Sequence, residues 1–114
     1  MSISTDIEVT RLRGMTATEH VRELNASTRA WVAEKPESRW ACLLVEDPAH
    51  WVEYQCTTGH DLARYLIVQD YWETYKDVHG VRPRHVSFEG MTLQECEAKL
   101  DADFPALPPR EVAL

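Results

Sequence analysis

Apolar residues recur with the spacing of an α-helix in three long segments of the chain. These segments cover residues 16–35, 59–78 and 92–104. Side chains three and four positions apart fall on one face of a helix, so each segment predicts a helix with one apolar side. The pattern favours a single, mainly α domain over residues 1–114, built as a small helical bundle of three to four helices.

Polar residues at the ends of these segments support the assignment. A threonine at the start of each segment, or directly before it, can act as N-cap, with an acidic side chain three positions later. The pairs are Thr16 with Glu19, Thr58 with Asp61, and Thr92 with Glu95. Pro36 ends the first helix near Lys35. Gly80 stands where the second helix needs a C-terminal cap.

Proline marks two further features of the chain. Asp47 followed by Pro48 is a typical helix start and predicts a shorter helix over residues 48–55. Residues 105–114 contain two consecutive prolines that cannot continue a helix. We expect this last stretch to be a flexible tail.

Three short stretches leave room for a minor β-element. Residues 6–12 alternate weakly and are compatible with an edge strand within an otherwise irregular 1–14. Residues 85–89 also alternate over a short distance. The apolar run 40–45 fits a buried strand as well as a buried helical turn. An α+β fold with a short two- or three-stranded sheet is therefore the alternative.

The segment 59–78 is apolar around much of its circumference. Its apolar stripe changes direction by more than a quarter turn halfway along the helix. The two stripes are Leu62, Tyr65 and Leu66, then Val68, Tyr71, Trp72, Tyr75 and Val78. Such a helix either lies at the centre of the core or keeps an apolar face for a partner. We expect the central position, with the other two long helices packed on its aromatic residues.

Charge narrows the classes of partner. The 114 residues carry a formal net charge of −7, most of it between residues 40 and 80. An acidic chain lacks the Lys and Arg excess that nucleic-acid binding needs, so direct nucleic-acid binding is not expected. The balance suits a basic protein partner, or simply solubility. The chain has neither an apolar run near 20 residues nor a secretory leader, so we expect a cytoplasmic protein without membrane association.

The sequence contains no complete catalytic or metal-binding signature. Its three cysteines are an odd number and widely spaced, which predicts reduced and mostly buried thiols. Cys56 and His60 are four apart, but a zinc site needs about four ligands and no matching pair exists. Cys56 precedes a helix N-terminus that could lower its pKa, which makes it the best candidate nucleophile. We nevertheless predict no enzymatic activity, no metal and no cofactor.

A candidate partner-binding surface lies mainly on the second half of 59–78 and just after it, with Glu53 added from the segment before this helix. Its acidic residues share one helical face, and aromatic and arginine side chains are common in binding hot spots. The candidate residues are Glu53, Asp70, Trp72, Glu73, Tyr75, Asp77, Arg82 and Arg84. The two arginines could grip an anionic group of a partner. We expect them instead to pair with Asp77 and the last carbonyls of the helix.

The stretch Y-W-E-T-Y-K-D-V-H-G-V-R-P-R, residues 71–84, resembles a segment of small accessory proteins encoded by bacteriophages and related mobile elements. The helix start Met91-Thr-Leu-Gln-Glu95 and the approach Thr57-Thr-Gly-His-Asp-Leu62 look similar too, so the resemblance covers roughly residues 50–100. It implies a phage protein acting inside a bacterium, and it establishes no catalytic residue.

Two functions follow as expectations from the surface and the resemblance. The first is a non-enzymatic, phage-encoded antagonist of a host defence complex, comparable to anti-CRISPR proteins. It would act through its acidic and aromatic surface on a basic surface of a host protein or ribonucleoprotein complex. The alternative is a structural or regulatory accessory domain that forms a homodimer through the leftover apolar face of 59–78. An enzyme that uses Cys56 is the third reading.

Overall fold

The chain folds into α-helices joined by irregular segments. The computed structural model describes residues 3–105. Within that range the helices are α1 (Asp6–Arg13), α2 (Ala17–Glu34), α3 (Pro48–Glu53), α4 (Gly59–His79) and α5 (Leu93–Asp103). The described residues contain no β-strand, and their one isolated β-bridge joins Thr16 to Thr58. The predicted mainly α fold is confirmed, with one more helix than expected.

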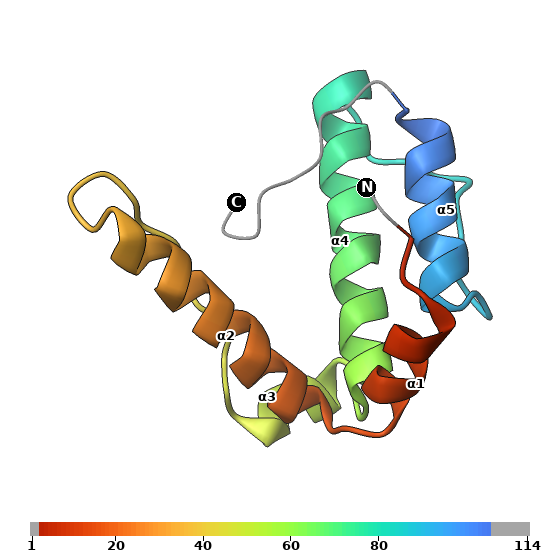
Figure 1. Ribbon diagram of the computed structural model, residues 1–114. Coiled ribbons are helices and arrows are strands. Elements are labelled where there is room, and N and C mark those ends of the chain that lie inside the picture. The colour runs from red at the N-terminus through yellow and green to blue at the C-terminus, as the bar shows by residue number, and fades with distance from the viewer. Residues whose placement is uncertain (1–2, 106–114) are drawn as a thin grey trace.

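The long helix α4 is the element against which α1, α2 and α5 pack. Figure 1 shows α5 parallel to α4, with α1 across the base of both and α2 diverging from the beginning of α4. The connection from α4 to α5 therefore runs back along much of α4 (Figure 1). The guanidinium of Arg64 on α4 holds this connection by donating to the main-chain oxygens of Phe88 and Met91.

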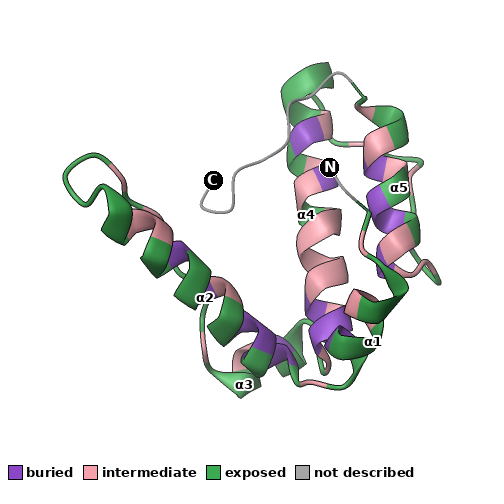
Figure 2. Cartoon of the chain, viewed as in Figure 1, coloured by how far each residue is buried: buried purple, intermediate pink, exposed green. Residues whose placement is uncertain are grey.

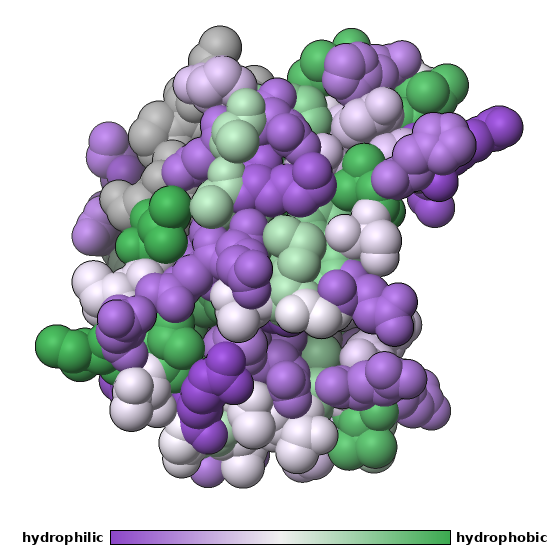
Figure 3. All heavy atoms as spheres, turned by 90° about the vertical axis from the view of Figure 1, so that its right-hand side faces the viewer, coloured by the Kyte–Doolittle hydropathy of each residue, from purple (hydrophilic) through white to green (hydrophobic). Residues whose placement is uncertain are grey.

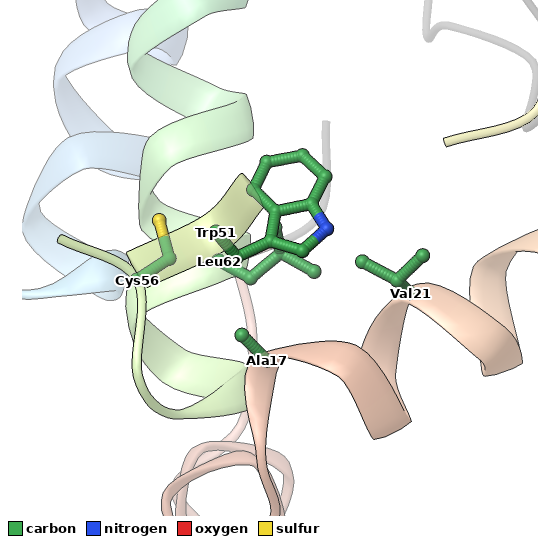
Figure 4. Close-up of a cluster of buried hydrophobic side chains, with 5 residues drawn as sticks. All are labelled: Ala17, Val21, Trp51, Cys56 and Leu62. Carbon is green, nitrogen blue, oxygen red and sulfur yellow. The ribbon is translucent and has the colours of Figure 1, made fainter. Parts of the chain in front are cut away.

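The first half of α4 faces a core that it shares with α2 and α3. This core contains the buried side chains of Ala17, Val21, Trp51, Cys56 and Leu62. Figure 4 shows Val21 on α2, Trp51 on α3 and Leu62 on α4 pointing toward one another. The indole N–H of Trp51 donates to the carbonyl of Val45 at 2.6 Å, so this large side chain is buried with its polar atom satisfied.

The second half of α4 faces a separate core with α5 and the returning connection. Its buried members are Tyr71, Phe88, Cys96 and Leu100. The change in stripe direction along α4 corresponds to this change of partner. Figure 2 shows buried positions near both ends of α4 and mostly intermediate ones between them. The expectation that α4 is central is correct, but α2 packs only on its first half.

Side chains cap the helices largely as the sequence predicts. Thr16 accepts from the amide of Glu19, and Asp47 accepts from that of Ala49. Thr58 and Thr92 each form a reciprocal capping box with the acidic residue three positions on. Gly80 ends α4 with a φ of 77°, a left-handed conformation that glycine adopts without strain.

Residues 6–12 are helical, so the proposed edge strand within 1–14 is wrong. Thr5 caps α1 by accepting from the amide of Glu8. Acidic residues lie in the first turn of α1 and basic residues in its last turn, the arrangement that the helix dipole favours. A weak alternation over seven residues was therefore a poorer guide than the capping and charge signals.

The other two β-candidates are also irregular segments. Residues 85–89 form no strand, although Phe88 is buried in the second core. Residues 40–45 form neither a strand nor a helical turn and run beside α2. The side chain of Asn25 fixes this run, since it accepts from the amide of Leu44 and donates to its carbonyl. Of the proposed flexible tail, residues 106–114 lie outside the described residues.

Candidate partner-binding site

A pocket of about 360 Å³ opens on the second half of α4. Four of its lining residues, Gln69, Trp72, Glu73 and Lys76, follow the spacing that places side chains on one face of a helix. The remaining wall comes from Arg82 and Pro83 in the segment after the helix. This pocket therefore lies within the surface that the sequence singles out.

The end of α4 brings the two walls together. The amide of Gly80 donates to the carbonyl of Lys76 at 2.8 Å, which closes the last turn. The left-handed conformation of Gly80 then reverses the chain, so that Arg82 and Pro83 return beside α4. A residue with a β-carbon would be strained at this φ, so glycine favours the reversal that forms the second wall.

The charged side chains that line the pocket have no polar partner within the described part of the chain. The side chains of Glu73, Lys76 and Arg82 are exposed, and none of these side chains makes a hydrogen bond or ion pair with residues 3–105. Two cations and one carboxylate thus surround the half-buried Trp72. Because no opposite charge within the described residues neutralises them, these side chains are available to a binding partner.

Trp72, the aromatic residue that lines the pocket, packs against the aromatic residues of the second core. The ring of Trp72 meets Phe88 edge-on at 5.4 Å between centroids, and Tyr71 at 5.8 Å. Tyr75 stacks on Tyr71 at 6.3 Å and lies 4.3 Å from the ring of His79. The two aromatic candidates are therefore largely packing residues, each of which keeps part of its surface exposed.

A polar contact holds α5 against the aromatic residues of the second core. The hydroxyl of Tyr71 donates to a carboxylate oxygen of Asp103 at 2.5 Å, and Lys99 binds the same oxygen at 3.1 Å. Burial, and then the hydrogen bond to the carboxylate, raise the pKa of Tyr71 far above its ordinary value. The phenol stays protonated and serves as a structural donor.

The structure brings together most of the acidic candidates but not all. Glu73 and Asp77 are exposed on α4, and the half-buried Asp70 is engaged by a neighbour. Glu53 ends α3, close to the start of α4 and so at the far end of that helix from the pocket (Figure 1). Glu53 therefore does not belong to the same surface.

The arginine pair does not behave as expected. Neither Arg82 nor Arg84 makes an ion pair with Asp77, or a hydrogen bond to a carbonyl at the end of α4, within the described residues. The pocket also includes Gln69, Lys76 and Pro83, which are not among the residues predicted from the sequence. The first two were detectable from their helical spacing to Trp72, whereas the place of Pro83 depends on the chain reversal at Gly80.

The candidate nucleophile Cys56 is placed unfavourably for catalysis. Its thiol is buried and lies within hydrogen-bonding range of the carbonyls of Tyr54 and Asp61. Burial, and next the negative charge of Asp61, raise its pKa to about 11, so the expected lowering by the helix N-terminus is wrong. Cys96 is buried too and Cys42 is exposed, so two of the three thiols are buried, in line with the expectation of mostly buried thiols.

His60 is occupied by structural contacts. Its Nε2 accepts from the amide of Leu93 at 3.2 Å and lies 3.3 Å from Nη2 of Arg13.

The part of the chain that the structure describes holds no cluster of three His, Cys, Asp or Glu side chains suited to a metal ion. Within the same residues, no helix combines the length and the apolar character needed to cross a membrane.

The side of the molecule formed by α5 offers less to a partner. Figure 3 shows this side with mostly hydrophilic side chains and hydrophobic ones in separate small groups.

Comparison with known proteins adds no family and no structural relative: no protein-family model, no curated protein and no solved structure matches this chain.

Proposed function

We propose that this chain is a non-enzymatic protein-binding domain whose contact surface includes the pocket beside Trp72. One observation carries the proposal: Glu73, Lys76 and Arg82 surround a half-buried tryptophan without compensating one another or any described residue. Tryptophan and arginine at the centre of a surface pocket are the residue types that dominate binding hot spots.

The proposed partner is a basic surface of a host protein or ribonucleoprotein complex. The net charge of −7 steers the chain toward basic surfaces and away from free nucleic acid. The local charges of the pocket are mixed, so they select the docking position rather than supply the long-range attraction. The resemblance of residues 71–84 to phage accessory proteins supports a role as an intracellular antagonist of a host defence complex.

The other two readings have less support. A homodimer through a leftover apolar face of 59–78 has little surface to use, because most apolar side chains of α4 pack in the two cores and Val78 is its exposed large apolar residue at 54%. An enzyme built on Cys56 would need a thiolate, and the raised pKa of that thiol keeps it protonated at neutral pH.

The direct test is affinity capture from a bacterial lysate with two charge-matched variants. Arg82→Glu alters the pocket, whereas Lys35→Glu makes the same change of charge beyond the last residue of α2. We expect the wild type and Lys35→Glu to retain one protein at low salt and to release it as salt approaches roughly 0.5 M, where charges are screened within a few ångströms. Arg82→Glu should retain at least about tenfold less.

Two results would count against the proposal. Recovery of no protein at low salt from any plausible bacterial host would remove the binding function. Equal losses in both variants would show that net charge, and not the pocket, determines capture.

A further inference from the structure

The apolar run from Trp40 to Val45 is largely uncovered, although its composition predicts burial. Trp40 is 80% exposed, Leu43 44% and Val45 46%. Tryptophan is highly buried on average, and exposed apolar groups that lie together mark interaction surfaces. This run is distant in sequence from the pocket on α4, and the proposed function does not use it.

The main chain of this run is open on one side. Asn25 of α2 occupies both main-chain polar groups of Leu44. By contrast, the N–H and C=O groups of Ala41 and Leu43 have no hydrogen-bond partner among residues 3–105. Unpaired main-chain groups next to apolar side chains are what an edge strand offers to another extended segment.

A groove of about 320 Å³ lies between this run and α2. Its apolar lining comes from Val32 and Ala33 on α2 and from Trp40, Ala41 and Leu43 on the run itself. A groove of this size can receive a large apolar side chain from a partner. The surface therefore combines a main-chain edge with a place for a side chain.

Charge indicates what could cover this surface. The run contains no charged residue from Trp40 to Val45, and Arg39 and Glu46 flank it. Two copies of a chain with a net charge of −7 repel each other over most orientations, but here they can meet without bringing like charges together. Arg39, which also lines the groove, binds Glu34, and Glu46 binds Arg29, so these flanking charges are compensated within each copy. Antiparallel pairing keeps the two Arg39 ends apart, whereas parallel pairing would place Arg39 beside Arg39 and Glu46 beside Glu46.

We propose that this face binds the same face of a second copy of the chain. The two runs pair antiparallel about a two-fold axis at Cys42, so that the open main-chain groups of Ala41 in one copy face those of Leu43 in the other. Each copy inserts apolar side chains into the groove of the other. Six residues and a shallow groove bury less than the roughly 800 Å² per partner of stable complexes. The dimer is therefore weak and forms reversibly as concentration rises. This interface is distinct from the apolar face of α4 considered above.

The test is analytical ultracentrifugation of the purified chain from about 10 µM to about 1 mM, the range in which weak dimers form. We expect the apparent mass of the wild type to rise from 13.1 kDa toward twice that value. Leu43→Lys should raise the dissociation constant at least about tenfold, because it introduces like charges at the centre of the interface.

Two control variants place the same charge on other exposed apolar positions. Ile7→Lys on α1 and Val78→Lys on α4 replace residues that are 84% and 54% exposed, and both should dimerise like the wild type. A wild type that stays monomeric at about 1 mM would overturn the proposal. So would a Leu43→Lys variant that dimerises normally, or a Val78→Lys variant that does not.

Alkylation of the natural Cys42 thiol gives a second measurement that needs no substitution. Cys42 is exposed, whereas Cys56 and Cys96 are buried and burial raises the pKa of both. The alkylation rate of Cys42 should fall several-fold as concentration rises and the interface closes over it. A rate independent of concentration, in a chain that dimerises, would place the interface elsewhere and overturn the proposal.

Discussion

A few buried polar side chains connect segments that are far apart in the chain. Asn25 is 1% exposed and joins α2 to Leu44 and, through the same amide nitrogen, to the carboxylate of Glu46. His60 joins α4 to the first residue of α5. Because water cannot replace these bonds at buried positions, each residue matters more for stability than its size suggests.

Asn25→Ala should lower the free energy of unfolding by about 2–3 kcal/mol, because it leaves the main-chain groups of Leu44 without their partner. Urea denaturation measures the change. Ser27→Ala, at an exposed position on the same helix, is the matched control and should stay within about 0.5 kcal/mol of the wild type. Equal effects of the two substitutions would mean that Asn25 does not hold the 40–45 run.

His60 should make the fold sensitive to acid. Burial, and then the positive charge of Arg13, lower the pKa of His60, so the folded chain binds its proton less readily than the unfolded chain. The stability from neutral His60 is therefore present above the ordinary histidine pKa of about 6.5 and is lost as pH falls toward the lowered folded value. One such proton changes the unfolding free energy by at most about 1.4 kcal/mol per pH unit.

Urea midpoints between about pH 7.5 and 5.5 test this prediction, since the window spans the ordinary histidine pKa. Wild type should exceed His60→Gln in stability at the upper end, and the difference should narrow toward the lower end. His85→Gln, at an exposed position, should follow the wild-type curve. A constant difference across the range would rule out proton linkage at His60.

At the scale of elements, the first turn of α4 sits tightly against the end of α1. A β-carbon on Gly59 would lie 2.7 Å from Cγ of Met15 and 2.9 Å from the carbonyl oxygen of Leu12. Main chain cannot yield as a flexible side chain can, so a larger residue must displace one helix relative to the other. At this close approach the amide of Gly59 also donates a hydrogen bond to the carbonyl of Met15 at 2.9 Å.

Gly59→Ala should therefore destabilise the fold by about 1–3 kcal/mol, although alanine is the better helix former. Gly14→Ala is the matched control, because its nearest contacts would be ordinary ones at 3.5 and 3.7 Å, and its effect should be small. Thermal unfolding of both variants gives the comparison. A Gly59→Ala variant as stable as the Gly14→Ala variant would mean that α1 and α4 adjust freely.

The long helices were predictable because several local signals agreed. Helical spacing, threonine caps and the C-terminal Gly80 all pointed to the same boundaries. The segments 6–12, 40–45 and 85–89 were not, because seven residues or fewer contain too little periodicity to separate a strand from a helix or an irregular segment. The fate of 40–45 also depends on Asn25, whose long-range bond to Leu44 leaves no trace in local sequence.

At the scale of the whole molecule, α4 separates two cores and keeps one more surface free. The direction change in its apolar stripe was visible in the sequence and corresponds to the two cores. The candidate site was predictable in part: Trp72, Glu73 and Arg82 line the pocket, whereas Glu53 lies at the other end of α4. The sequence does not reveal this separation, because many residue pairs with the same spacing in sequence are in contact. It follows from where the fold places α3.

Arg82 and Arg84 have two alternative roles, to stabilise the end of α4 or to bind a partner. Neither Arg82 nor Arg84 has a partner within the described residues, which reverses the expectation that they clamp the end of α4. The double variant Arg82→Ala/Arg84→Ala should therefore keep the unfolding free energy of the wild type to within about 0.5 kcal/mol. It should nevertheless lose the protein that the wild type captures.

The most direct test of the proposed binding surface is to measure thermal stability and partner capture on this one double variant. Unchanged stability with lost capture is the predicted result. A stability loss of about 1–3 kcal/mol, as for broken charge-assisted hydrogen bonds, with capture reduced only in proportion to the unfolded fraction, would show that the arginines are structural and contradict the proposal.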